Sequence, residues 1–257
     1  MNPPKHPFIP MEPNGSERRR YDTHDRGSVF PDDDRCICPG GDPGEPVDYV
    51  AGDTTLDEYA RRRARMLAEL GYVALAVDMY GEGRQAQHPD DAGKFSGKIQ
   101  KNMDLGRERF LAAMKILQGH RFTDPGRVGA IGYCFGGSVV LQMARDGMDL
   151  GGVVSFHGGL KTTNPAKPGA VNARILVLTG DDDKFVPPEQ VEDFQKEMKA
   201  TRADFRVVSY PGALHNFTNP AADDYAKKFN LPLGYNADAD KKSWAEMQTF
   251  FKDVFGK

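Results

Sequence analysis

The sequence predicts an α/β fold in which a mostly parallel β-sheet is covered by helices on both faces. Short runs rich in Val, Ile and Leu alternate along the chain with longer helical patterns. These runs are apolar throughout rather than alternately polar, as is typical of strands buried on both faces of a parallel sheet. A chain of 257 residues, 39% of them hydrophobic, can bury one large core. We therefore expect one α/β domain at residues 57–257.

The first 56 residues have a different character. They hold nine of the chain's 18 prolines, charged clusters, and the run GGDPG at residues 40–44. No helical or strand periodicity persists there. We interpret residues 1–56 as an atypical Pro/Gly-rich segment that forms loop or disorder.

Helical spacing begins near Leu56. Apolar residues recur at positions 56, 60, 64, 67 and 70, and Gly71 stands where a helix C-terminal cap belongs. The arginines of this stretch are interpreted as the solvated face of the helix: Arg61, Arg62, Arg63 and Arg65.

From this helix onward, strands and helices alternate as a parallel sheet requires. The predicted strands are residues 72–79, 128–133, 152–156, 174–179 and 205–210. The predicted helices are residues 104–117, 136–145 and 188–200, followed by a last helix that carries Trp244, Met247, Phe251 and Val254. In this architecture, ligands bind beyond the carboxyl ends of the strands.

Composition excludes several function classes. A net charge of -3 provides no broad cationic surface for nucleic acid or an anionic membrane. No stretch approaches the roughly 18 apolar residues of a transmembrane helix, and residues 1–20 lack the apolar core of a secretory signal. We expect a cytoplasmic monomer that acts on a small molecule.

The three cysteines are too few for a disulfide framework, so each needs its own explanation. Cys36 and Cys38 form a C-x-C pair without a second pair at metal-site spacing. A zinc module that uses them with His24 is therefore the weakest of the alternative functions. We expect neither a metal nor a cofactor.

Cys134 lies in a motif that carries chemistry. A buried strand runs into GYCFGG at residues 132–137, and a helix follows. This is the nucleophile elbow, G-x-nucleophile-x-G, in its strand-turn-helix context. Side chains at Gly132 and Gly136 would collide with neighbouring backbone, and the helix N-terminus favours the thiolate form of the cysteine. A buried structural cysteine beside a tight turn is the competing interpretation.

Two later strands end in polar groups that fit the same chemistry. Asp181, Asp182 and Asp183 follow the strand at residues 174–179, and a carboxylate there can orient a histidine. His215 follows the next strand. The chain order of nucleophile, acid and histidine is that of α/β-hydrolases. Chemistry alone leaves the choice among the three aspartates open.

The sequence resembles the dienelactone hydrolase family, whose elbow carries cysteine where most α/β-hydrolases carry serine. The matching segments are GYVALAVDMY at 71–80, GYCFGG at 132–137, DKFVP at 183–187 and YPGALHNF at 210–217. The resemblance implies Cys134 as nucleophile, His215 as base and Asp183 as the acid. It further implies the Phe135 N–H as an oxyanion donor. The expected reaction is hydrolysis of a small ester or lactone through an acyl-enzyme.

Family substrates bear a carboxylate that arginine holds, and Arg84, in the loop after Tyr80, is the candidate here. An ordinary exposed loop arginine is the competing interpretation. The enzyme that gives the family its name has a second arginine four residues after the histidine, where this chain has Asn219. This difference weighs against dienelactone itself as the substrate.

The family also places a strand before the helix near Leu56, and its loop supplies a second oxyanion N–H and a glutamate. Residues 43–56 are polar, and the nearest substitutes, residues 35–38 and 47–50, are short. We therefore expect the N-terminal strands to be missing or atypical. Two alternative functions follow: a general carboxylesterase or thioesterase on the same fold, and a catalytically impaired homologue that lacks part of the oxyanion hole.

Overall fold

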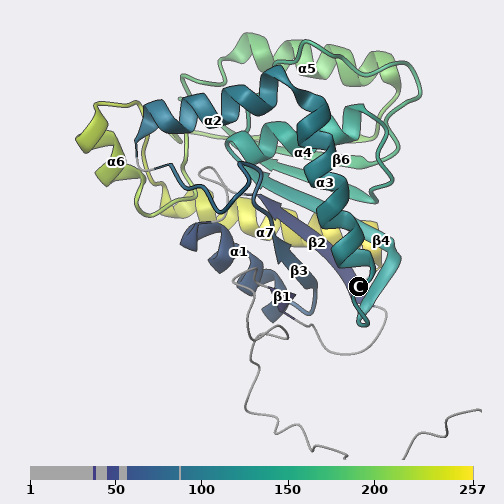
Figure 1. Cartoon of the computed structure of the whole chain (residues 1–257). Coiled ribbons are helices and arrows are strands. Elements are labelled where there is room, and N and C mark those ends of the chain that lie inside the picture. The colour runs from purple at the N-terminus through teal and green to yellow at the C-terminus, as the bar shows by residue number, and fades with distance from the viewer. Residues whose placement is uncertain (1–36, 39–44, 52–56, 87, 257) are drawn as a thin grey trace, which may run out of the picture.

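A seven-stranded sheet forms the centre of the molecule (Figure 1). The computed structural model describes residues 37–38, 45–51, 57–86 and 88–256, and only the backbone of the first two ranges. The strands lie in the order β1-β3-β2-β4-β5-β6-β7; β1 is antiparallel to β3, and the other neighbours are parallel. Their bounds are β1 Ile37–Cys38, β2 Glu45–Ala51, β3 Val73–Ala76, β4 Thr123–Tyr133, β5 Gly152–Phe156, β6 Arg174–Gly180 and β7 Phe205–Tyr210.

Helices cover both faces of this sheet, as the sequence predicts (Figure 1). One face packs against α3, α4 and α5, and the other against α1 and α7. The helix bounds are α1 Glu58–Glu69, α2 Pro89–Lys101, α3 Met103–Gln118, α4 Phe135–Arg145, α5 Pro188–Thr201, α6 Ala222–Phe229 and α7 Ala237–Phe255. Helix α1 ends as expected, because Gly71 follows it in a left-handed conformation.

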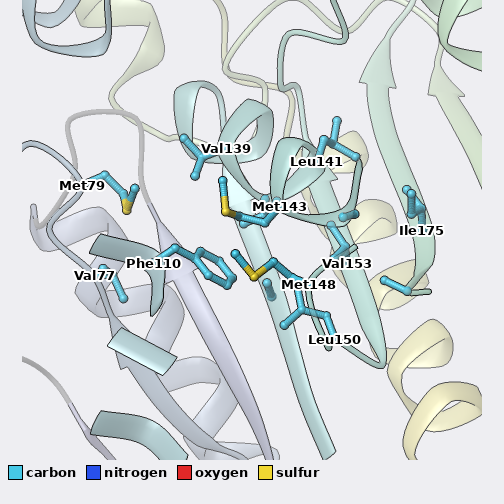
Figure 2. Close-up of a cluster of buried hydrophobic side chains, with 14 of the residues drawn as sticks. Val77, Met79, Phe110, Val139, Leu141, Met143, Met148, Leu150, Val153 and Ile175 are labelled. Carbon is cyan, nitrogen blue, oxygen red and sulfur yellow. The ribbon is translucent and has the colours of Figure 1, made fainter. Parts of the chain in front are cut away.

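Successive residues of the central strands point into different cores. Val153 of β5 belongs to the cluster under α3, α4 and α5, whereas Val154 belongs to the cluster under α1 and α7. Figure 2 shows the first cluster, in which Phe110 of α3 and Met143 of α4 lie over the sheet. Burial on both faces explains why these strands are apolar throughout.

Of the two expectations for the N-terminal strands, missing or atypical, the first is wrong. Glu45–Ala51 forms β2, which is paired with β3 on one side and β4 on the other. Loop or disorder is likewise wrong for β1 and β2, whereas residues 1–36, 39–44 and 52–56 lie outside the described residues. Two flanking strands satisfy the backbone groups of a central strand, so a short apolar run suffices to form it.

The parallel arrangement brings the carboxyl ends of the strands to one edge of the sheet. Ala51, the last residue of β2, is in register with Gly132 of β4, two residues before Cys134. The carboxyl end of β2 therefore lies next to the elbow.

One expectation for α1 needs correction. Arg63 does not lie on a solvated face, because only 2% of its surface is exposed. Its guanidinium donates to Asp240 Oδ1 of α7 at 2.5 Å and to the Thr218 carbonyl at 2.8 Å. A carboxylate and a carbonyl satisfy the buried charge, which sequence spacing alone does not reveal.

Candidate active site

Cys134 lies at the sharp turn between β4 and α4. Its backbone has φ 48° and ψ −114°, a conformation that non-glycine residues seldom adopt and that costs on the order of 1–3 kcal/mol. The turn is tight because Gly132 lies against the start of α4. A Cβ at Gly132 would lie 2.2 Å from the carbonyl carbon and oxygen of Gly136. The structure thus confirms that a side chain at Gly132 would collide with neighbouring backbone.

Three side chains, from the loops after β4, β6 and β7, meet at this turn. His215, after β7, has its Nε2 3.1 Å from Cys134 Sγ. Its Nδ1 lies 2.8 Å from Asp183 Oδ2, after β6. An ionised carboxylate only accepts, so Nδ1 carries the proton and Nε2 is the free acceptor that faces the thiol. This geometry allows a proton to pass from sulfur to imidazole.

Among the three neighbouring aspartates, the geometry selects Asp183. Its side chain is fully buried, and its Oδ1 accepts from the Phe185 and Val186 N–H groups at 2.8 and 3.2 Å. Asp181 and Asp182 are exposed, and Asp181 accepts a hydrogen bond from Ser209. The two backbone donors and His215 fix the Asp183 carboxylate in one orientation.

Phe135 lies at the elbow, whereas the Arg84 side chain lies at the surface. Phe135 is the first residue of α4, where a backbone N–H has no acceptor within the helix. Its ring stacks on Tyr80 at 5.7 Å, so the loop after β3 lies against the elbow. Arg84 belongs to that loop, but its guanidinium pairs with Glu82 at the surface.

Several predictions fall outside the described residues. The second oxyanion donor would belong to residues 52–56, directly after β2, and the sequence of this segment, GDTTL, contains no glutamate. Cys36 and His24 are not described, and only the backbone of Cys38 is. Within the described ranges, His, Cys, Asp and Glu form no cluster that could hold a metal ion. None of the helices in those ranges has the length and hydrophobicity of a membrane-spanning segment.

Sequence reasoning missed His157, which directly follows β5 and is fully buried. Its Nδ1 accepts from the Cys134 N–H at 3.2 Å, and its Nε2 lies 2.8 Å from Thr218 Oγ1. Its ring also lies edge-on to that of His215, with 5.2 Å between centroids. A polar residue at the carboxyl end of a buried strand was the signal that could have revealed it.

Burial lowers the pKa of His157 well below the usual 6.5, and the nearby His215 and Arg63 lower it further. Below pH 6.5, His157 therefore binds a proton in the unfolded chain but stays neutral in the folded chain. The stabilisation is complete above the unfolded pKa near 6.5 and declines as the pH falls below it. We expect the free energy of unfolding to decrease by up to about 1.4 kcal/mol per pH unit from this residue.

Urea unfolding of wild type and His157→Asn at several pH values between 7.5 and 5 measures this contribution. The variant should show a shallower decline than wild type, because Asn does not titrate. Parallel declines in the two proteins would contradict the assignment.

The chain is similar in sequence to a known protein family and to individual proteins. The model of the dienelactone hydrolase family matches residues 52–255. "Protein usf" of Aquifex pyrophilus is 31% identical, with 72% of this chain and 77% of the relative covered. An Aquifex aeolicus protein named "Putative carboxymethylenebutenolidase" is 28% identical over similar shares, 72% and 77%.

Solved structures agree with these sequence matches. A dienelactone hydrolase-like promiscuous phosphotriesterase from metagenomic libraries is 31% identical, with a TM-score of 0.75 and coverage of 83% of this chain and 88% of that chain. The structure named m3DLH is 34% identical, with a TM-score of 0.77 and the same coverage. The similarity extends over the sheet and helices that position the three side chains.

Proposed function

The chain belongs to the dienelactone hydrolase family, and from this membership we propose that it hydrolyses a small ester or lactone through Cys134, His215 and Asp183. The observation that carries the proposal is the 3.1 Å separation of Cys134 Sγ and His215 Nε2, with Asp183 at 2.8 Å behind the imidazole. A nucleophile, a base and an orienting acid in contact are what acyl transfer requires.

In the first half-reaction, His215 Nε2 takes the proton of the Cys134 thiol and the thiolate attacks the carbonyl carbon. The Asp183 carboxylate stabilises the imidazolium that forms. The tetrahedral intermediate then collapses, and the C–O bond of the ester breaks. The leaving alkoxide takes the proton from His215, which leaves a thioester on Cys134.

In the second half-reaction, His215 takes a proton from water, and the hydroxide attacks the thioester carbonyl. Collapse of the second intermediate breaks the C–S bond, releases the carboxylic acid and returns the proton to sulfur. We propose the Phe135 N–H as one donor to the oxyanion in both halves, because it lies at the start of α4 beside Cys134.

Phe185 is an apolar wall beside the proposed base. Its side chain is 46% exposed although it is large and hydrophobic, and its ring centroid lies 4.8 Å from that of His215. We expect Phe185→Ala to raise the KM for esters with aromatic acyl groups about threefold to tenfold, because an aromatic contact contributes about 0.5–1.5 kcal/mol. The kcat should stay within about threefold.

Steady-state kinetics with benzoyl and acetyl esters checks this prediction, and the acetyl ester is the control. An equal change in KM for both esters would show that Phe185 does not contact the acyl group.

We propose Arg84 as the residue that binds a substrate carboxylate, in place of its ion pair with Glu82. Arg84→Ala should then raise the KM for a carboxylate-bearing lactone about tenfold, since a charge-assisted hydrogen bond contributes about 1.5–3 kcal/mol before solvent screening. The KM for a neutral lactone of the same ring size should not change. Equal effects on the two lactones would remove Arg84 from the site.

A substrate panel tests the proposed function and its nearest alternatives. Chromogenic esters, acyl thioesters and lactones are offered to the purified protein, and Cys134 is examined by mass spectrometry after rapid acid quench. An acyl adduct on Cys134 and turnover of esters or lactones are expected. Preference for thioesters would favour the thioesterase alternative, and a folded protein without adduct or turnover would favour the impaired homologue.

A further inference from the structure

We propose that His157 is a positioning residue that holds the nucleophile elbow and the catalytic-histidine loop at the separation that proton transfer requires. This inference rests on the proposed function of Cys134 and His215. It assigns a role to a buried side chain that the reaction scheme does not use.

His157 links the two loops through opposite atoms of one ring. Nδ1 accepts from the Cys134 N–H, which it shares with the Phe156 carbonyl at 3.0 Å. Nε2 bonds to Thr218 Oγ1, three residues after His215. The ring therefore spans from the backbone of the nucleophile to the loop that carries the base.

The hydrogen bonds determine the tautomer of His157. A backbone N–H can only donate, so Nδ1 must accept, and the proton lies on Nε2 and is donated to Thr218. A second proton on the ring, at Nδ1, would make two N–H donors face each other, one from His157 and one from Cys134. It would also add a positive charge near His215. Burial, together with His215 and Arg63, lowers the pKa of His157 and keeps the ring neutral.

Two residues with strained backbone conformations meet at this contact. Cys134 has φ 48° and His157 has φ 41°, and such conformations persist only where the surroundings hold them. The His157 N–H also donates to the Leu178 carbonyl of β6 at 2.7 Å, which fixes the residue between β5 and β6.

Thr218 is in turn held from the opposite side. Its hydroxyl lies 2.6 Å from the hydroxyl of Tyr59 in α1, and its carbonyl accepts from Arg63 at 2.8 Å. Burial raises the pKa of Tyr59 to about 12, so this hydroxyl stays protonated and available for hydrogen bonding. These hydrogen bonds hold the loop that carries His215 in place, and His157 connects that loop to the nucleophile elbow.

Two substitutions break the His157–Thr218 bond from opposite ends. Asn suits the positive φ of residue 157 and retains an acceptor at the position of Nδ1, but it does not reach Thr218. Thr218→Val removes the acceptor with little change in shape. For each variant we expect kcat to fall about tenfold to a hundredfold, the loss that a displacement near 1 Å can cause. The KM should stay within about threefold.

Alkylation of Cys134 by iodoacetamide, followed by peptide mass spectrometry across pH, measures the cysteine without any substrate. Both variants should move the midpoint of the profile to higher pH, because a looser Cys134–His215 pair forms thiolate less readily. Thr218→Ser keeps the hydroxyl and should restore wild-type behaviour. Thr218→Ser is therefore the matched control for Thr218→Val, because the two differ in the hydroxyl that His157 Nε2 contacts.

The double variant His157→Asn/Thr218→Val should be no slower than the slower single variant, since both remove one bond. Additive losses, or folded single variants with wild-type kcat and alkylation, would overturn the role of His157. If His157→Asn does not fold, the Thr218→Val and Thr218→Ser pair decides the question. Absence of ester and lactone turnover in wild type would refute the proposed function alone, because alkylation still reports the positioning.

Discussion

Cys134→Ala is expected to reduce ester or lactone turnover by a factor on the order of 10⁴ or more, with the fold retained. The substitution removes the sulfur atom that we propose forms the acyl bond, and it leaves His215 and Asp183 in place. Alanine accepts the strained turn about as well as cysteine does, so thermal unfolding should shift little. Turnover and unfolding are measured on the same preparation.

His215→Ala tests whether the two residues act as a unit. It should lose about as much turnover as Cys134→Ala, and the double variant should be no slower than either single variant, because each step needs both residues. A Cys134→Ala protein that retains a tenth of wild-type turnover would contradict the proposed nucleophile.

Gly132→Ala is expected to cause the largest loss of stability among small substitutions in the elbow. The added Cβ would lie 2.2 Å from the Gly136 backbone and 2.5 Å from the Gly137 nitrogen. Backbone atoms cannot move aside as a flexible side chain can, so β4 and α4 must separate. We expect a destabilisation of about 3 kcal/mol or more and a loss of turnover of about a hundredfold.

Gly93→Ala is the matched control, because the same methyl is added where nothing lies within 4 Å, at an exposed position of helix α2. It should stabilise the protein by up to about 1 kcal/mol through helix propensity. Urea unfolding of both variants measures the contrast. A Gly132→Ala protein as stable as wild type would mean that the elbow has room that the structure does not show.

The sequence predicts the strands and helices that bury the most apolar surface. The bounds expected for β5 and β7, residues 152–156 and 205–210, are those of the structure. Helix α2 escaped prediction because its two glycines weaken the helical signal and only Ile99 is buried. Strand β2 escaped because pairing with two neighbours, rather than its own pattern, stabilises it.

The candidate site is predictable to the extent that chain order and strand ends define it. The positions of Cys134 and His215 after predicted strands are enough to expect them at one edge of the sheet. Contacts that cross the fold are not predictable in this way. His157 bonds to Thr218, and Arg63 bonds to Asp240. Because these partners are distant in sequence, no local pattern predicts the contacts.

The loops that carry Cys134, His157, Asp183 and His215 follow β4, β5, β6 and β7, which are consecutive both along the chain and across the sheet. The chain could therefore be divided between α3 and β4 without separating these residues. One fragment would hold all four, and the other would hold β2, the strand that covers the edge of β4. Such a pair would form a split enzyme, in which recovered turnover after mixing reports that the two fragments have reassociated.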